Sequence, residues 1–293
     1  IFVSNLFQQL YNTVDTMIVG NVLGDTALAA IGSCGSIYEL LVGFGIGIGN
    51  GLAIVAARSY GAQDEDLLKK TVAGSLVIGF LSSLCITLAG LVGLHPLLVL
   101  LDTPAEILEE AYSYILIIDV GVLVMFAYNL CAGLLRAIGN SFMPLIFLLM
   151  AAVANIGFDI LSVTVLKLGV RGPAFATLLA QAFSVVLSLW CIKTKFPILK
   201  MEPGEWKLHG KHISILCKMG IPMGLQYSIT AIGSVVLQPG INTLGSAAVA
   251  SVSAASKLSM FLACPFDAIG SAMATYTGQN VGAGKIERIG QGL

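Results

Sequence analysis

The segment NVLGDTALAAIGSCGSIYELLVGFGIGIGNGLAIVAARSYGA, residues 21–62, is the most informative part of the sequence, because a faint second copy of it occurs later in the chain. Laid without gaps over NTLGSAAVASVSAASKLSMFLACPFDAIGSAMATYTGQNVGA, residues 242–283, it matches at 11 of 42 positions, at an offset of 221 residues. This offset is far longer than the roughly 20–50 residues of solenoid repeats. The repeat therefore predicts a molecule built from two similar halves.

Composition places the chain in a membrane. Hydrophobic residues make up 57% of it, charged residues only 11%, and the mean hydropathy is +0.92. Soluble domains carry about 25% charged residues, so buried helices of a soluble protein are a poor alternative. Six runs without Asp, Glu, Lys or Arg reach or approach the roughly 20 residues that cross a bilayer core. They are residues 40–57, 71–101, 120–135, 137–158, 172–192 and 219–256.

Positive charge predicts the orientation of the chain. We expect eight helices, at about residues 1–22, 27–57, 71–93, 108–134, 143–166, 172–192, 213–238 and 246–281. Twelve Lys and Arg residues lie in or beside the connections after the even-numbered helices, against Lys167 and Arg171 on the other side. The twelve are Arg58, Lys69, Lys70, Arg136, Lys193, Lys195, Lys200, Lys207, Lys211, Lys218, Lys285 and Arg288. The positive-inside rule then predicts a cytoplasmic N-terminus in the plasma (inner) membrane.

Six helices return the chain to its starting side, so both copies enter the membrane in the same direction. Such halves are related by an axis along the membrane normal, as in transporters built from parallel repeats. The predicted fold is all-α and integral to the membrane. It comprises a six-helix lobe (1–192), a cytoplasmic linker (193–212) and the first two helices of a pseudo-symmetric second lobe (213–293). By this symmetry we expect a fragment lacking about four helices.

One face of the first helix is polar. Asn5, Gln8, Asn12 and Asp15 are spaced three, four and three residues apart, which places them on a single helical face. Lipid cannot solvate this stripe, so it is expected to face the bundle or an aqueous cavity. A helix lying on the membrane surface is the alternative, but such helices favour Lys and Arg, and residues 1–22 contain neither.

Asp15 is the strongest candidate for a residue that binds a proton or a cation. Desolvation favours a protonated carboxyl and a nearby cation favours an ionised one, so this group can exchange a proton for a cation. Tyr11, four residues earlier, lies on the same face and is placed to donate to it. The alternative is a carboxylate that neighbouring hydroxyls satisfy for packing alone.

A second polar pair lies in the fifth expected helix. Asn155 and Asp159 are four residues apart and share a face. An amide oxygen beside a carboxylate suits Na⁺ or a shared proton, although a hydrogen-bonded contact between helices is the alternative. Thr177 in the next helix offers a further hydroxyl.

Three more acids fall within expected spans and are candidates for lining a substrate path: Glu39, Asp119 and Asp267. Glu39 and Asp119 lie toward the outer side, so snorkelling at the membrane boundary is the alternative for both. The glycines at 43, 47 and 51 and those at 45 and 49 form small-residue faces that permit close helix packing. The six cysteines show no metal-ligand spacing, so no cofactor is expected.

Taken together, these residues resemble the multidrug and toxic compound extrusion (MATE) family. The resemblance covers essentially the whole chain and rests on the order of several short motifs. They are LYNTVD (10–15), VG (19–20), RSYGA (58–62), LRAIGN (135–140), Asn155-x-x-x-Asp159 and GQNVGA (278–283).

The resemblance implies a twelve-helix fold in two lobes and the export of small organic cations, often aromatic, in exchange for H⁺ or Na⁺. It also implies an ion site, a possible Na⁺ site, at Asp15, Asn155, Asp159 and Thr177. Tyr11, Gln8 and Asn12 then join the three acids as candidate cavity residues. The expected partners are these cations and the lipid bilayer, with no nucleic acid, and the expected state is a monomer.

Two other functions remain open. A lipid-linked oligosaccharide flippase of the wider superfamily needs basic residues in its cavity, and Lys257 is the one basic residue placed inside an expected span. A membrane-embedded enzyme is the alternative from another class, but the sequence contains no HExxH or GxSxG motif. Under the repeat offset Asp15 pairs with Val236, so the ion site is expected in the first lobe alone.

Overall fold

The computed structural model describes residues 1–201, 204, 208–244 and 246–293, and no strand occurs among them. The linker predicted at 193–212, with Lys207, lies in part outside the described residues. The helices are α1 (Phe2–Leu23), α2 (Asp25–Ser33), α3 (Gly35–Gly61), α4 (Glu65–Leu100), α5 (Ala105–Val120), α6 (Val122–Ala137), α7 (Phe142–Ile160), a π-helical turn (Leu161–Val165), α8 (Arg171–Lys195), a short 3₁₀ turn (Pro197–Leu199), α9 (Gly210–Asn242), α10 (Ser246–Gly282) and α11 (Glu287–Gly292).

The eight expected helices are present, but two of them are broken. The helix expected at 27–57 divides at Cys34 into α2 and α3, where Gly32 and Gly35 weaken helix propensity on both sides. The helix expected at 108–134 divides at Gly121, and its two parts are bent by 48°. Apolar periodicity continued across both breaks, so the pattern alone did not reveal them.

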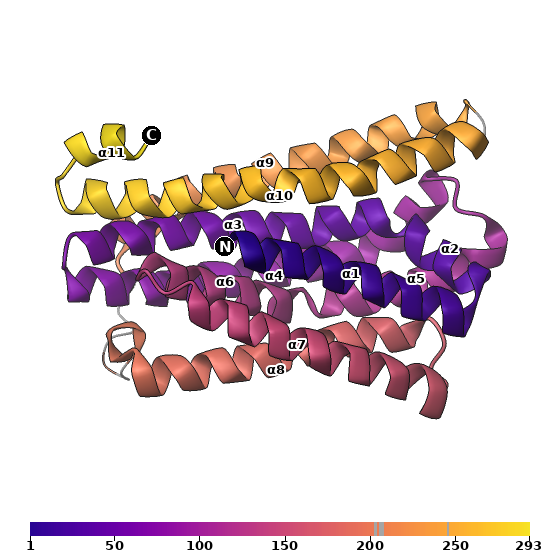
Figure 1. Cartoon of the computed structure of the whole chain (residues 1–293), viewed down its shortest axis with the longest axis horizontal. Coiled ribbons are helices and arrows are strands. Elements are labelled where there is room, and N and C mark those ends of the chain that lie inside the picture. Colours follow the sequence, from indigo (N-terminus) through magenta and orange to yellow (C-terminus); the bar gives the residue numbers. More distant parts are fainter. Residues whose placement is uncertain (202–203, 205–207, 245) are drawn as a thin grey trace.

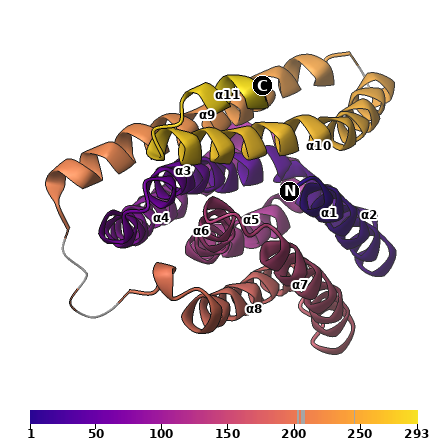
Figure 2. The ribbon, with the colours of Figure 1, turned by 60° about the vertical axis from the view of Figure 1, so that its left-hand side comes forward.

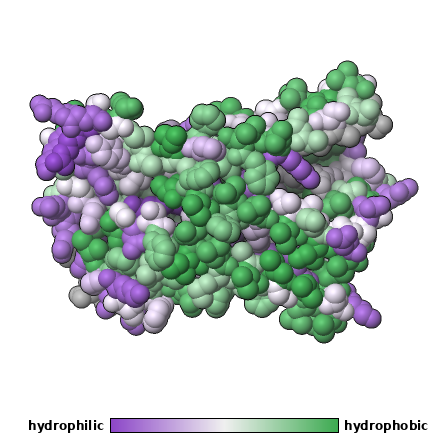
Figure 3. Space-filling model, viewed as in Figure 1, coloured by the Kyte–Doolittle hydropathy of each residue, from purple (hydrophilic) through white to green (hydrophobic). Residues whose placement is uncertain are grey.

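The protein is a multi-pass membrane protein. Within the described residues, six helices are long and apolar enough to cross a membrane, or seven if the bent pair α5 and α6 forms one span. The six are α3, α4, α7 with its π-helical turn, α8, α9 and α10. On the face shown in Figure 3, a wide apolar band separates polar groups at the two ends. The remaining expected span, α1, has 22 residues and is long enough to cross a membrane. It is not among these six helices, and it carries the polar stripe.

The helices run nearly side by side along the long axis (Figure 1), and α3 lies at their centre. It packs against α4 and α6 on one side and against α9 and α10 on the other (Figure 2). Two apolar cores support it, one around Leu52 and Leu135 and one around Ile37 and Ile118. Thus α3 joins the first lobe to the helices of the second half.

Glycines let these helices meet backbone to backbone. A Cβ atom on Gly51 would lie 2.6 Å from the carbonyl oxygen of Met219 in α9, and one on Gly47 would clash with Met223. This confirms close packing at two of the predicted small-residue positions. Near the end of α3, a Cβ on Gly61 would clash with the α10 backbone at Gln279, and one on Gly282 would clash with the α3 backbone. Gly61 and Gly282 are equivalent positions of the repeat, so the two halves touch at matching residues.

We predict that Gly282→Ala destabilises the protein, because its methyl group has no space between two helix backbones. Overpacking of this kind costs about 1–3 kcal/mol, measured as a lower midpoint of thermal unfolding in detergent. The matched control is Gly233→Ala in α9, where nothing lies within 4 Å of the added Cβ. That change should leave stability unchanged or raise it by about 0.5–1 kcal/mol. Equal midpoints for the two variants would contradict the prediction.

Candidate functional site

Three of the four predicted ion-site residues form one hydrogen-bonded cluster between α1 and α7. The side-chain amide nitrogen of Asn155 donates to Asp15 Oδ1 at 3.3 Å and to Asp159 Oδ2 at 3.1 Å. Asn155 and Asp159 are 0% exposed, and Asp15 is half-buried. One amide thus ties together two carboxyl groups that lie 144 positions apart in the sequence.

The cluster contains more acceptors than donors. The carboxyl groups of Asp15 and Asp159 both accept a hydrogen bond from the Asn155 amide and interact electrostatically with each other. Asn155 Oδ1 and Asp159 Oδ1 are buried and have no partner within the described structure. Two carboxylates this close repel each other when both are ionised. The arrangement therefore suits a proton or a hard cation.

Thr177 and Tyr11 extend the cluster toward α8. The Thr177 hydroxyl donates to the backbone carbonyl of Pro173 at 2.9 Å, so its lone pairs remain available. Tyr11 lies near Thr177 and within electrostatic range of Asp15. Its expected donation to Asp15 stays a prediction.

The remaining polar residues of α1 separate into two environments. Gln8 lines a small cavity of about 20 Å³ beside Tyr11 and Gln181, which has room for about one water molecule. The Gln181 Oε1 atom is buried there without a partner in the described structure. Asn12, in contrast, is exposed and lines neither this cavity nor the larger ones described next.

Two larger cavities lie between α3 and the second-half helices α9 and α10. One, of about 510 Å³, is lined by Glu39 of α3 and Asp267 of α10, with Tyr38 and Tyr227. The other, of about 300 Å³, shares Tyr227 and Asp267 with the first and adds Arg136 of α6. The two cavities are adjacent, and we call them together the central cavity. Its size falls within the usual range of ligand-binding pockets.

Asp119 lies away from the residues that line the central cavity. It is 0% exposed, and its carboxyl group packs on the Cα of Gly90 in α4. The Thr87 hydroxyl donates to its backbone carbonyl at 3.0 Å. Asp119 lines neither part of the central cavity, and its burial argues against snorkelling at the membrane boundary.

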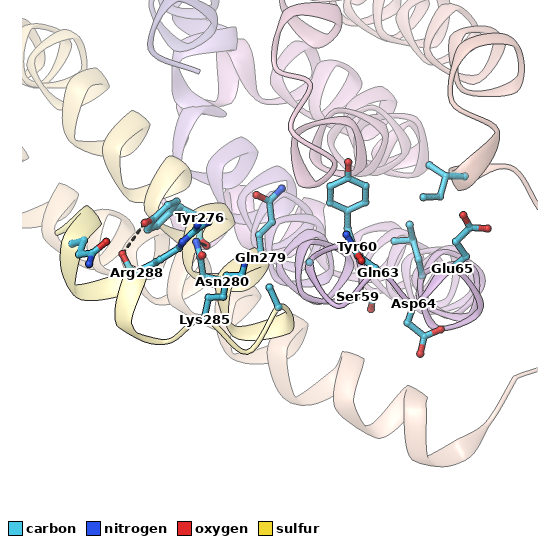
Figure 4. Close-up of a pocket in the computed structure, with 15 residues that line it drawn as sticks. Ser59, Tyr60, Gln63, Asp64, Glu65, Tyr276, Gln279, Asn280, Lys285 and Arg288 are labelled. Atoms are coloured by element: carbon cyan, nitrogen blue, oxygen red, sulfur yellow. Dashed lines mark hydrogen bonds between the residues drawn. The ribbon is translucent and has the colours of Figure 1, made fainter.

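A further pocket of about 880 Å³ opens at the end of the molecule where α3 meets α10 and α11. Figure 4 shows Asp64 and Glu65 on one side of it and Lys285 and Arg288 on the other. It contains none of the predicted ion-site residues. The predicted cytoplasmic connections gather at this end, so we treat it as a vestibule distinct from the ion cluster.

Sequence reasoning missed several residues of the central cavity. Arg136 was counted among the basic residues in or beside the connections, and it occupies the last turn of α6. It also lines the central cavity, which the sequence did not indicate. Tyr38, Asn50 and Tyr227 also line it. A Tyr or Asn in an apolar helix is common in packing, so nothing in the pattern distinguished these three.

We predict that Asn155→Leu destabilises the protein, because two buried carboxyl groups lose the amide that joins them. Removing a partner from buried polar groups costs about 1–3 kcal/mol, measured by thermal unfolding. Asn12→Leu, in the exposed part of the same polar stripe, is the control and should have little effect. The hydrogen-bonded cluster would be refuted as a stabilising unit if both variants unfolded at the same temperature as the unmodified protein.

Comparisons with known proteins agree with this architecture. The model of the MatE family matches residues 1–161 and 222–293. The chain is 29% identical over 293 residues to YpnP, and 28% identical over 300 residues to YoeA. Both relatives come from Bacillus subtilis and are named probable multidrug resistance proteins. Each alignment covers 99% of this chain and 64% of the relative, so the chain spans about two-thirds of their length.

Solved structures show the same fold. A transporter of the MOP superfamily from Pyrococcus furiosus is 22% identical to this chain, with a TM-score of 0.92. The match covers 99% of this chain and 65% of the Pyrococcus furiosus chain. For that transporter, the reverse polarity of its binding pocket suggests a different function. A MATE structure in the straight conformation is 23% identical to this chain, with a TM-score of 0.89. The match covers 100% of this chain and 65% of the MATE chain.

Proposed function

Because the chain belongs to the MatE family, we propose that it is part of a secondary active antiporter that exports small organic cations in exchange for H⁺ or Na⁺. The observation that carries this proposal is the pairing of Asp15 with Asp159 through Asn155. The relatives are named as resistance proteins or transporters, which supports a transporter over a membrane-embedded enzyme. We also propose a monomer in the plasma membrane with a cytoplasmic N-terminus and no nucleic-acid partner.

The ion cluster has the chemistry that coupling requires. Asp15 and Asp159 supply two carboxyl groups, and the free oxygens of Asn155 and Thr177 complete a set of hard oxygen donors. Na⁺ favours such donors, and a proton shared by the two carboxyl groups removes their repulsion equally well. Either ion lowers the net charge of the two ionised carboxylates from −2 to −1, so loading and unloading changes how strongly α1 is held against α7.

The central cavity has the chemistry of a site for organic cations. Glu39 and Asp267 present carboxyl groups in its wider part, where no Lys or Arg is found. Tyr38 and Tyr227 offer aromatic faces, which attract cations. A lipid-linked oligosaccharide flippase is the weaker candidate, because pyrophosphate would face these acids and only Arg136 opposes them.

Alternating access follows from the contacts at one end of the cavity. Gln279 in α10 donates to the carbonyl of Ala137 in α6 at 2.7 Å, and Gly61 meets α10 nearby. These contacts close the end that carries the basic connections. Rocking of the halves about this region would open it to the cytoplasm, as in other transporters built from repeats.

We predict that Asp15→Asn abolishes dye efflux, because an amide neither binds a proton nor attracts a cation as a carboxylate does. The measurement is fluorescent-dye extrusion from cells expressing the complete gene product, with membrane insertion checked by fractionation. Asp25→Asn, an exposed position at the start of α2, is the control and should retain efflux. Full efflux by the Asp15 variant would remove this residue from the mechanism.

We predict that an imposed ion gradient drives transport in reconstituted vesicles. A proton gradient and a sodium gradient are imposed separately, and the expected result is cation uptake with at least one of them. The same gradient should fail with Asp159→Asn, since half of the carboxyl pair is lost. If neither gradient moves the cation, the antiport proposal is wrong.

A further inference from the structure

Asp119 is a buried carboxyl group that belongs neither to the ion cluster nor to the central cavity. It is 0% exposed, and neither of its side-chain oxygens has a hydrogen-bond partner within the described structure. It follows Ala105, the first residue of α5, by fourteen residues, or about 21 Å along the helix. Because the hydrocarbon core of a bilayer is about 30 Å thick, the group lies well inside the membrane.

The charged groups that contact α5 face its first half instead. His95 of α4 lies 3.8 Å from Glu109, and Arg171 of α8 donates to the Ser113 hydroxyl at 3.5 Å. Among the described residues, no titratable group of a helix that packs against α5 is hydrogen-bonded to the Asp119 carboxyl. Apart from those at the end with the basic connections, the other titratable residues of these helices, of the break before α3 and of α5 itself are Asp25, Cys34, Tyr38, Glu39, Cys85, Glu106, Glu110, Tyr112, Tyr114, Tyr128 and Cys131.

A glycine brings this carboxyl group against the backbone of α4. A Cβ atom on Gly90 would overlap both carboxyl oxygens of Asp119, so the position leaves no room for a side chain. The Thr87 hydroxyl, three residues earlier, donates to the backbone carbonyl of Asp119. The carboxyl group therefore packs on a helix backbone without a donor for a charged oxygen.

Asp119 also lies at a bend in the chain. Gly121, two residues later, separates α5 from α6, and the two helices are bent by 48°. A Cβ atom on Gly121 would overlap the Leu178 side chain of α8, and Leu178 follows Thr177 of the predicted ion site. The bend is thus held between α4 at Gly90 and α8 at Leu178. A change in its angle would separate Asp119 from Gly90 and let water reach the carboxyl group.

These surroundings suit a proton better than a metal cation. An ionised carboxylate that is buried without a partner is so costly that it takes up a proton instead. A hard cation needs several oxygen ligands. Within the described residues, no group of three or more His, Cys, Asp or Glu side chains could hold a metal ion.

We propose that Asp119 is a second proton-binding site, which holds its proton while it packs on Gly90 and releases it when the bend between α5 and α6 changes. On release the O–H bond breaks, the electron pair stays on the carboxylate, and the proton passes to water. The inference goes beyond the proposed function, because it does not depend on which ion the cluster on α1 and α7 binds. The alternative is a structural role, in which a neutral group fills the space over Gly90 and never loses its proton.

Infrared spectroscopy of the purified complete gene product reads this proton directly, because protonated carboxyl groups absorb apart from carboxylates and backbone amides. We expect Asp119→Asn, which keeps the shape of the side chain, to remove one protonated-carboxyl band at neutral pH. Asp25→Asn, at an exposed position, is the matched control and should remove none, since an exposed Asp is ionised at that pH. An unchanged carboxyl region in Asp119→Asn would overturn the proposal.

A second pair of variants tests the packing, and it also serves if Asp119→Asn does not fold. Gly90→Ala pushes the carboxyl group off α4, so it should lower the pH at which half of the band is lost by at least about one unit. Gly93→Ala lies in the same helix with nothing within 4 Å of the added Cβ, so this pH should stay unchanged. Equal values for the two variants would show that packing on Gly90 does not hold the proton.

Transport in reconstituted vesicles separates proton release from a structural role. We expect Asp119→Asn to shift the pH of half-maximal uptake by at least about one unit, and Asp25→Asn to leave it unchanged. Loss of the infrared band with an unchanged pH dependence would mean that the proton never leaves, and would overturn the release. If no ion gradient drives uptake by the unmodified protein, the antiport proposal fails, whereas the infrared titrations still decide the site at Asp119.

Discussion

Contact between helix backbones at α3 determines where everything else in this protein lies. Gly47 and Gly51 allow α9 to touch α3 without side chains between them, and Gly61 and Gly282 do the same for α3 and α10. These contacts leave no room for a side chain between the helices, so they fix how closely α9 and α10 approach α3. The central cavity is therefore the space that remains between helices whose closest points are already fixed.

The repeat explains the shape of the cavity but not its charge. Glu39 is equivalent to Met260, and Ile46 is equivalent to Asp267, and all four line the wider part of the cavity. Each half thus supplies one acid, and the matching position in the other half is apolar. The two acids are offset by seven residues of the repeat, which is about 10 Å along a helix. A symmetric scaffold carries an asymmetric distribution of charge.

Local spacing predicted those parts of the site that lie on one helix. Asn155 and Asp159 are one turn apart, so their contact followed from helical geometry alone. Their contact with Asp15 depends on the packing of α1 against α7, which the pattern does not contain and which came from family resemblance. The break at Cys34 and the packing of Asp119 on Gly90 also depend on neighbouring helices. The position of Arg136 beside a connection was predicted, but its place in the cavity wall was not, because a charge that ends an apolar run looks the same in a loop and in a cavity.

Tyr38 connects the two sites physically. It lies in the first turn of α3 after the break, lines the central cavity beside Glu39 and is within electrostatic range of Asp15. Tyr38 is therefore near both Asp15 and the wall of the central cavity. Because α3 is also the helix held by glycine contacts to α9 and α10, any movement of Tyr38 and its helix is transmitted to the second half. If an ion binds at Asp15 as proposed, Tyr38 and α3 are the elements that would connect it to the cavity between the halves.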